Sequence, residues 1–354
     1  MKFGIHLYMK KRLIVALLTL CVCKVFSQDR QFTQFYASPL TLNPALSGLF
    51  EGKYRVGAIY RDQWRGLIDK PYQTFSFGAD LRLEPFSSNV SKDKIGVGLM
   101  FFKDKVNALD FSTTQIAISG AYHKAMDLDG SQYLSAGFQI GLTQRNVNYE
   151  NLNFQDQWNG TDKFSGRSEE KLPENNFGYS DFSAGLNYTA TFEPKTSIFI
   201  GASAHHLNSP NVSFYKGDEL PKIALSMRYS VQMAMNYPIN RAHTLFMSPR
   251  IVASMQGQHL TMNAGTNFRV NIDKTYNTSL HFGSWVRPVK GIDGINLDAV
   301  VVMGGVEFNG VLLGLSYDLN LPNLKNYRRS QNVFEISLIY LGNYDSDELL
   351  CPSF

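Results

Sequence analysis

The sequence is poor in cysteine, in charged residues and in long apolar runs. Only three cysteines occur in 354 residues, and two of them lie within the first 27. If those 27 residues are removed, Cys351 remains alone, which excludes an intramolecular disulfide framework and a metal site with several cysteine ligands. No apolar run of about 18 residues or more follows residue 27, so no membrane-spanning helix is predicted.

The charge of the chain gives no support to a nucleic-acid partner. Charged residues make up 18% of the chain, with 34 basic and 30 acidic side chains. Five basic residues and no acidic residue lie within 1–27, so the remainder carries 29 basic against 30 acidic residues. The positive net charge of the full chain therefore belongs to its first segment, and we predict no nucleic-acid partner.

That first segment has the pattern of an export signal. Three basic residues at 10–12 precede the apolar run 13–23, and small residues stand at the positions that a signal peptidase reads. The apolar run is too short for a helical membrane anchor, and the residue before Cys23 argues against a lipoprotein anchor. We therefore predict a cleaved signal peptide over 1–27 and a mature chain that begins near Gln28.

Recognised catalytic motifs are missing as well. The sequence has no Gly-x-Ser-x-Gly elbow, no His-Glu-x-x-His pair, no Walker loop and no dinucleotide fingerprint. The histidines are scattered, and in a regular strand the adjacent His205 and His206 would point to opposite faces. We predict no enzyme activity, no cofactor and no metal site, and we interpret the histidines as interfacial residues. A hydrolase site assembled from distant strands is the alternative that one sequence leaves open.

What the sequence has in quantity is period-two alternation. In residues 181–190, one face carries Phe, Ala, Leu and Tyr, and the other carries Ser, Gly, Asn and Thr. The same pattern recurs at 260–270 and at 311–319. Such alternation indicates strands with one apolar and one polar face.

About 14 such segments follow one another, most of them near the ~9–11 residues that a tilted strand needs to cross a bilayer. Their expected starts are Tyr54, Tyr72, Lys94, Phe111, Gln132, Gly178, Thr196, Lys222, His243, His259, Tyr276, Asn296, Phe308 and Asn332. We predict an all-β outer-membrane protein with a transmembrane antiparallel β-barrel over 54–342. A periplasmic or plug segment at 28–53 precedes the barrel, and a tail at 343–354 follows it.

A soluble secreted β-sandwich is the main alternative fold, because its strands also alternate. Its apolar faces would point inward, whereas those of a membrane barrel point outward. The polar faces contain few Lys or Glu, which suits a crowded lumen, and the apolar faces end in aromatic residues of the kind found at membrane interfaces. These aromatic residues are Tyr54, Tyr60, Phe111, Tyr122, Trp285, Tyr317, Phe334 and Tyr340.

Dense motifs at both ends of the mature chain resemble one family. The opening run 28–36 reads QDRQFTQFY, and 38–45 contains Ser-Pro-Leu and Leu-Asn-Pro-Ala. Tyr-Arg-Asp-Gln-Trp follows at 60–64, and the closing strands contribute 316–320 and 334–338. These motifs resemble the PorP/SprF family of Bacteroidota.

The resemblance implies an outer-membrane component of the type IX secretion and gliding machinery. Such a protein would support the secretion, or the cell-surface anchoring, of a partner protein such as an adhesin. Its implied partners are outer-membrane lipid, type IX secretion components and a large secreted surface protein. A plugged outer-membrane transport barrel for small solutes is the alternative function.

We predict partner-binding residues in the opening segment, at the end of the first strand and in the long connection 146–177. The segment 28–53 combines proline, glycine and aromatic rings, so it should be ordered only by packing against the periplasmic mouth or inside the lumen. The end of the first strand would carry either a cargo contact or an interfacial anchor. The long connection is either a lid, plug or partner surface, or a solvated insertion. The candidate residues are Phe32, Phe35, Tyr36, Asn43, Pro44, Arg61, Trp64, Arg65 and Trp158.

Overall fold

The computed structural model of the chain describes residues 29, 31–65, 71–84, 92–107, 110–150, 152–166, 168–192, 195–215, 223–273, 278–291, 294–321 and 332–342. The expected signal peptide, the C-terminal tail and Cys351 lie outside the described residues. No helix in the part that is described is long and apolar enough to cross a membrane.

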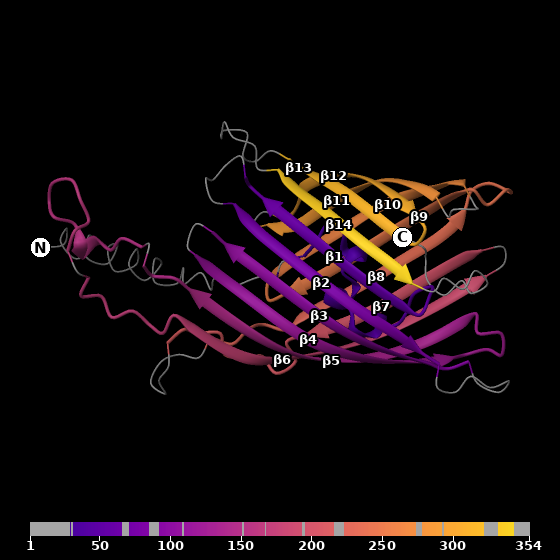
Figure 1. Ribbon diagram of the computed structural model, residues 1–354, viewed down its shortest axis with the longest axis horizontal. Coiled ribbons are helices and arrows are strands. Elements are labelled where there is room, and N and C mark those ends of the chain that lie inside the picture. Colours follow the sequence, from indigo (N-terminus) through magenta and orange to yellow (C-terminus); the bar gives the residue numbers. More distant parts are fainter. Residues whose placement is uncertain are drawn as a thin grey trace, which may run out of the picture.

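Within the described residues, fourteen antiparallel strands close into one barrel (Figure 1). They are β1 Tyr54–Gln63, β2 Tyr72–Leu83, β3 Lys94–Val106, β4 Phe111–Ala125, β5 Gln132–Val147, β6 Asn176–Phe192, β7 Thr196–His205, β8 Arg228–Pro238, β9 Leu245–Gln256, β10 His259–Asp273, β11 Thr278–Gly291, β12 Gly294–Phe308, β13 Val311–Asn320 and β14 Val333–Gly342. Each strand pairs with its neighbours in sequence, and β1 closes the barrel against β14, from Tyr54 opposite Gly342 to Gln63 opposite Val333. The predicted barrel of about 14 strands is confirmed.

The strands turn their apolar faces outward and their polar faces into the lumen, as in a membrane barrel. On β6, Leu186 is 60% exposed on the outside, whereas Ser183 and Asn187 are buried inside the barrel. The same arrangement holds on β13, where Leu313 is exposed and Ser316 is buried. Because the apolar faces point outward, the sandwich alternative is excluded.

The barrel has two mouths that differ in their connections. The terminal mouth is the one at which β1 begins and β14 ends. The loop mouth is the opposite one, and it carries the two longest connections, 148–175 and 206–227.

For two strands the predicted first residue was wrong, and the local structure explains the difference. β8 begins at Arg228 rather than Lys222, because residues 223–225 bond to 210–212 instead of the wall; for example, Val212 N donates to Ile223 O at 2.8 Å. β13 begins at Val311 rather than Phe308, because Asn309 and Gly310 both have positive φ and form the hairpin turn.

Some residues expected at the membrane interface lie inside the barrel instead. Trp285 is buried in the lumen, where its ring stacks on Tyr36 at 6.3 Å, and Phe111 lines a polar lumenal cavity. The interpretation of the histidines was also wrong for the buried ones, His123, His205, His206 and His281. His205 and His206 both face inward, because a φ of +60° at His206 breaks the alternation of the strand.

Candidate functional site: the plugged lumen and the loop mouth

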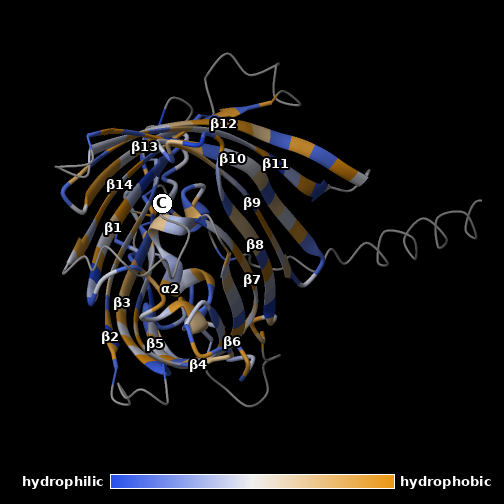
Figure 2. Ribbon diagram, turned by 90° about the vertical axis from the view of Figure 1, so that its right-hand side faces the viewer, coloured by the Kyte–Doolittle hydropathy of each residue, from blue (hydrophilic) through white to orange (hydrophobic). Residues whose placement is uncertain are grey.

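Residues 31–53, called the plug below, run through the lumen from the loop mouth to the terminal mouth. Three short helical turns shape the plug: η1 (Phe35–Ala37), α2 (Pro39–Leu42) and η2 (Pro44–Leu46). Prolines begin α2 and η2, where a missing N–H costs nothing. The Asn43 side chain caps η2 by accepting from Ala45 N at 2.9 Å. Figure 2 shows α2 inside the ring of strands.

A buried carboxylate holds the start of the plug. Glu335 on β14 accepts the backbone N–H groups of Thr33 and Gln34, each at 2.8 Å. Arg61 on β1 pairs with the same carboxylate at 2.7 Å and donates to Gln31 O at 3.1 Å. A buried charge is tolerated only when it is paired and hydrogen-bonded. Glu335 and Arg61 therefore stabilise each other and the plug together.

A second buried ion pair holds the end of the plug. Asp80 on β2 pairs with Arg55 on β1 at 2.7 Å and accepts the backbone N–H of Gly48 at 2.8 Å. Arg55 also donates to Leu46 O at 3.2 Å. The plug is thus bound to the wall near both mouths through its main chain.

Wall glycines let the middle of the plug approach the strands closely. A Cβ at Gly96 on β3 would lie 1.7 Å from the carbonyl oxygen of Ser47. A Cβ at Gly185 on β6 would lie 1.8 Å from Asn43 Oδ1. The amide of Asn43 also donates to Leu186 O at 3.1 Å. A larger residue at either glycine would push the plug away from the wall.

Asp29, just before the plug, binds a histidine near the loop mouth. His206 contacts Asp29 through Nε2 at 2.5 Å and Asp181 through Nδ1 at 2.9 Å, and Arg228 Nη1 lies 3.2 Å from Asp29. Burial alone would lower the pKa of His206, but the charges of Asp29 and Asp181 and their hydrogen bonds outweigh it and raise the pKa to about 9. Burial opposes the ionisation of Asp29 too, yet His206 and Arg228 lower the pKa of its carboxyl.

The structure places the predicted site residues in three separate regions. Those inside the lumen are buried or half-buried: Phe32, Phe35, Tyr36, Asn43, Pro44 and Arg61. Trp64 is half-buried at the loop mouth, Arg65 is exposed beside it, and Trp158 is exposed on the 148–175 connection. Arg61 does not form an exposed contact with Trp64, because it is drawn inward to Glu335. Partner binding by any of these residues stays a prediction.

Sequence reasoning missed the wall charges that hold the plug, which are Arg55, Asp80, Asp318 and Glu335. Each is a charged residue on the lumenal face of a strand, where it must find a partner inside the barrel. Asp318, for example, accepts from Thr33 Oγ1 at 2.8 Å and pairs with Arg287 at 2.5 Å. Charged residues at inward positions of the strands were therefore the signal that could have located the plug contacts.

A cavity of about 490 Å³ opens at the loop mouth beside the start of the plug. Trp64, Tyr72, Arg287 and Lys290 contribute to its lining. Trp64 has a φ of +65°, which is unusual for a bulky residue, and its ring meets Tyr72 edge-on at 5.1 Å. The end of β1 thus forms part of a hollow surface at this mouth.

The 148–175 connection, called the arm below, projects away from the barrel at the loop mouth (Figure 1). Its tip is held by its own contacts. Trp158 and Phe164 form a β-bridge with ring centroids 5.0 Å apart, and Asp156 accepts from Glu169 N at 2.7 Å. Trp158 and Phe164 are 44% and 47% exposed, so the arm presents an ordered aromatic pair.

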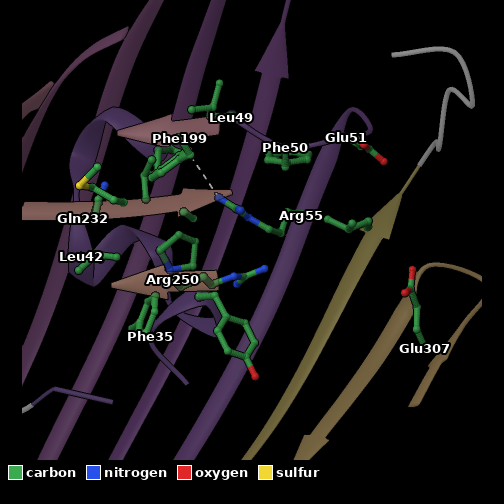
Figure 3. A pocket seen from close by; sticks show the side chains of 16 residues that line it. Phe35, Leu42, Leu49, Phe50, Glu51, Arg55, Phe199, Gln232, Arg250 and Glu307 are labelled. Carbon is green, nitrogen blue, oxygen red and sulfur yellow. Dashed lines mark hydrogen bonds between the residues drawn. The ribbon is translucent and has the colours of Figure 1, made fainter. Parts of the chain in front are cut away.

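A smaller apolar cavity of about 90 Å³ lies between the plug and the barrel wall (Figure 3). Leu42, Leu49 and Phe50 line it from the plug side, and Phe199 lines it from the wall. The side chain of Arg250 also reaches into the ring of lining residues (Figure 3). The lumen therefore contains an apolar hollow beside the plug.

Comparison with known proteins identifies a family. The family model described as Type IX secretion system membrane protein PorP/SprF matches residues 24–340, whereas no curated protein sequence matches significantly. Among solved structures, the chain is similar to a deltaS2S3 mutant of the monoaromatic hydrocarbon channel TodX, with 12% identity, a TM-score of 0.48 and coverage of 87% of this chain and 94% of that one.

Two further solved structures are similar in the same way. The toluene transporter TbuX of Ralstonia pickettii has 12% identity and a TM-score of 0.46, over 86% of this chain and 94% of that one. BamA of Haemophilus ducreyi lacking POTRA domains 1–3 has 11% identity and a TM-score of 0.41, over 82% and 70%. At these values the likeness carries no argument about function.

Proposed function

The chain belongs to the PorP/SprF family of type IX secretion system membrane proteins, and we propose that it supports the secretion or cell-surface anchoring of a large partner protein. A closed barrel with outward apolar faces in such a family is an outer-membrane protein. Because both ends of the barrel lie at the terminal mouth and the longest connections lie at the other, we assign the terminal mouth to the periplasm and the loop mouth to the outside. A cleaved signal peptide over 1–27 belongs to the same proposal.

The observation that carries the proposal is the attachment of the plug near both mouths. A solute path along the plug would require its main-chain N–H groups to leave the buried carboxylates of Glu335 and Asp80, and each such hydrogen bond to a charged group contributes about 1.5–3 kcal/mol. A lumen closed in this way fits an anchor better than an open pore. The surface that binds the partner protein would then lie outside the lumen. The exposed Trp158–Phe164 pair of the arm is our candidate for it, because aromatic residues are enriched at protein interfaces.

Affinity purification from native outer membranes tests this proposal. Tagged wild-type protein, crosslinked before extraction, is expected to co-purify with type IX secretion components and one large surface protein. The double variant Trp158→Ala/Phe164→Ala should lose the surface protein, whereas Phe192→Ala, which removes an aromatic residue 47% exposed at the terminal mouth, should retain it. If all three proteins recovered equal amounts of the surface protein, the arm would not be its docking surface.

Single-channel conductance separates the anchor from the transport alternative. An anchor is expected to pass little current through the wild-type protein in planar bilayers. Steady conductance, or solute-dependent flux, together with purification of the barrel alone, would favour a plugged transport barrel for small solutes.

A further inference from the structure

The cavity of about 490 Å³ at the loop mouth, called the vestibule below, has the size of a small-molecule site, for which about 300–1,000 Å³ is usual. Strands β1, β2 and β10–β14 surround it, and Gln31 lines it from the start of the plug. Arg61 also lines it, and Arg61 binds the Glu335 carboxylate that holds the plug. Because the plug is fixed to the wall at this level, a ligand would enter the vestibule from the loop mouth.

The charged groups of the vestibule leave little net charge for a ligand. Its lining contains five Asp, Arg and Lys side chains. Two of them, Lys290 and Asp298, are opposite in charge. A ligand without charge therefore suits this lining better than an ion. The other three are paired with further residues: Arg61 with Glu335, Arg287 with Asp318, and Asp29 with both His206 and Arg228.

Neutral polar side chains in the vestibule have free hydrogen-bonding capacity. Gln31 on the plug, and His259 and Thr261 on β10, line the cavity and are half-buried. Within the part of the chain that the structure describes, none of these three side chains has a hydrogen-bond partner. Amide, imidazole and hydroxyl groups can each donate and accept. They therefore match a ligand whose own groups do both, such as one rich in hydroxyl groups.

The rest of the lining is aromatic and aliphatic. Trp64 and Tyr72 meet edge-on with ring centroids 5.1 Å apart, and Val289 and Val333 complete this part of the surface. The backbone N–H of Trp64 donates to Asn332 O at 3.2 Å, which ties the residue to the end of the barrel. Aromatic faces carry negative charge density, and the C–H groups of a sugar ring are slightly positive. A sugar ring thus fits both parts of the lining.

We propose that the vestibule binds the uncharged end of a saccharide, with its hydroxyl groups at Gln31, His259 and Thr261 and its C–H groups against Trp64. A peptide fits less well. It would enter a hollow closed by the plug through one of its ends, and both ends of a free peptide are charged, whereas the lining offers little free charge. The saccharide site is independent of the partner-anchoring role proposed above.

Equilibrium binding to the full chain in lipid nanodiscs tests the site. The saccharide probes are maltose, cellobiose and chitobiose, which are neutral disaccharides. The peptide probe is acetyl-Gly-Asn-Gly-amide, which is neutral and of similar size. At least one disaccharide is expected to bind saturably with a Kd of about 1 mM or lower, and the peptide at least about tenfold more weakly than that disaccharide.

The saccharide could be free in solution or part of lipopolysaccharide, and the composition of the nanodisc separates the two sources. If the glycan of lipopolysaccharide reaches the vestibule, adding lipopolysaccharide to the nanodisc should raise the apparent Kd of the disaccharide. An unchanged Kd would assign the site to free saccharides.

Two variants localise the binding. Thr261→Val keeps the shape of the side chain but loses its hydroxyl group, so it should weaken disaccharide binding by about two- to tenfold. Trp64→Ala removes the apolar surface and should weaken it by at least about tenfold. Thr113→Val is the matched control, since Thr113 is also half-buried in a lumenal cavity, but in a different one. It should bind the disaccharide like the wild type.

Several results would overturn the site. An absence of saturable binding by all three disaccharides would refute it outright. A capped peptide that binds as tightly as the disaccharides would show that the vestibule accepts a peptide segment instead. Disaccharide binding that is unchanged in Thr261→Val would place the ligand elsewhere, and this holds even if Trp64→Ala does not assemble.

Discussion

The plug and the arm are segments of comparable length outside the strands, yet they are ordered in opposite ways. The plug relies on the barrel wall, because Glu335 and Asp80 accept its backbone N–H groups. The arm relies on itself, through Asp156 and the bridge between Trp158 and Phe164. The plug is therefore part of the interior of the barrel, whereas the arm is a surface that can change without disturbing the fold.

The largest effect is expected when the wall loses a carboxylate that holds the plug. Glu335→Ala should lower the free energy of unfolding by about 3–5 kcal/mol, because it leaves Arg61 buried without its acid and two N–H groups without an acceptor. Urea unfolding in lipid vesicles measures this change. The control is Glu169→Ala on the exposed arm, which should stay within about 0.5 kcal/mol. If the two variants lost similar amounts of stability, the proposed difference between the plug, which depends on the wall, and the arm, which does not, would be wrong.

A smaller loss of stability is expected when a methyl group is added where the wall and the plug are in close contact. A Cβ at Gly96 would overlap the Ser47 carbonyl, so Gly96→Ala should cost about 1–3 kcal/mol of stability and should raise single-channel conductance as the plug shifts. Gly120→Ala on β4 is the matched control, since a Cβ there would meet nothing within 4 Å. A Gly96→Ala protein with wild-type stability and conductance would mean that the plug does not press on this strand.

The contact between Asp29 and His206 makes the stability of the barrel depend on pH. The pKa of His206 is raised to about 9 in the folded protein, so its stabilising contribution is complete below about pH 6.5, the ordinary histidine value, and is lost as the pH rises through 9. The groups facing His206 are Asp29, Asp181, Arg228 and His205. The difference in unfolding free energy between wild type and His206→Gln should therefore shrink across this window. A constant difference from pH 6 to about 10 would contradict the ion pair.

Period-two patterning predicted the barrel well because each strand has one face in lipid and one in the lumen. It correctly predicted that Leu186 lies on the outward face of its strand. It wrongly predicted Trp285 to face the membrane, because the pattern alone does not distinguish an aromatic residue that packs on the plug from one that faces lipid. It also failed at His206, where a single positive φ reverses the side chain.

The candidate site was predictable only in part. The opening motif indicated a segment that needs packing, and the lumen supplies it. The contacts themselves join residues about 300 positions apart, such as Thr33 and Glu335. Alternation within one strand carries no information about which strands will face each other across a lumen.

The smallest effect on stability is expected at the tip of the arm. Trp158→Ala should change the free energy of unfolding by no more than about 0.5 kcal/mol, because the ring is exposed and its aromatic contact is with Phe164 of the arm itself. Trp285→Ala, the buried counterpart stacked on Tyr36, should cost about 3–5 kcal/mol. The same urea titration compares the two tryptophans in one protein. If Trp158→Ala were as destabilising as Trp285→Ala, the arm would have to pack on the barrel, and its role as a free docking surface would fail with it.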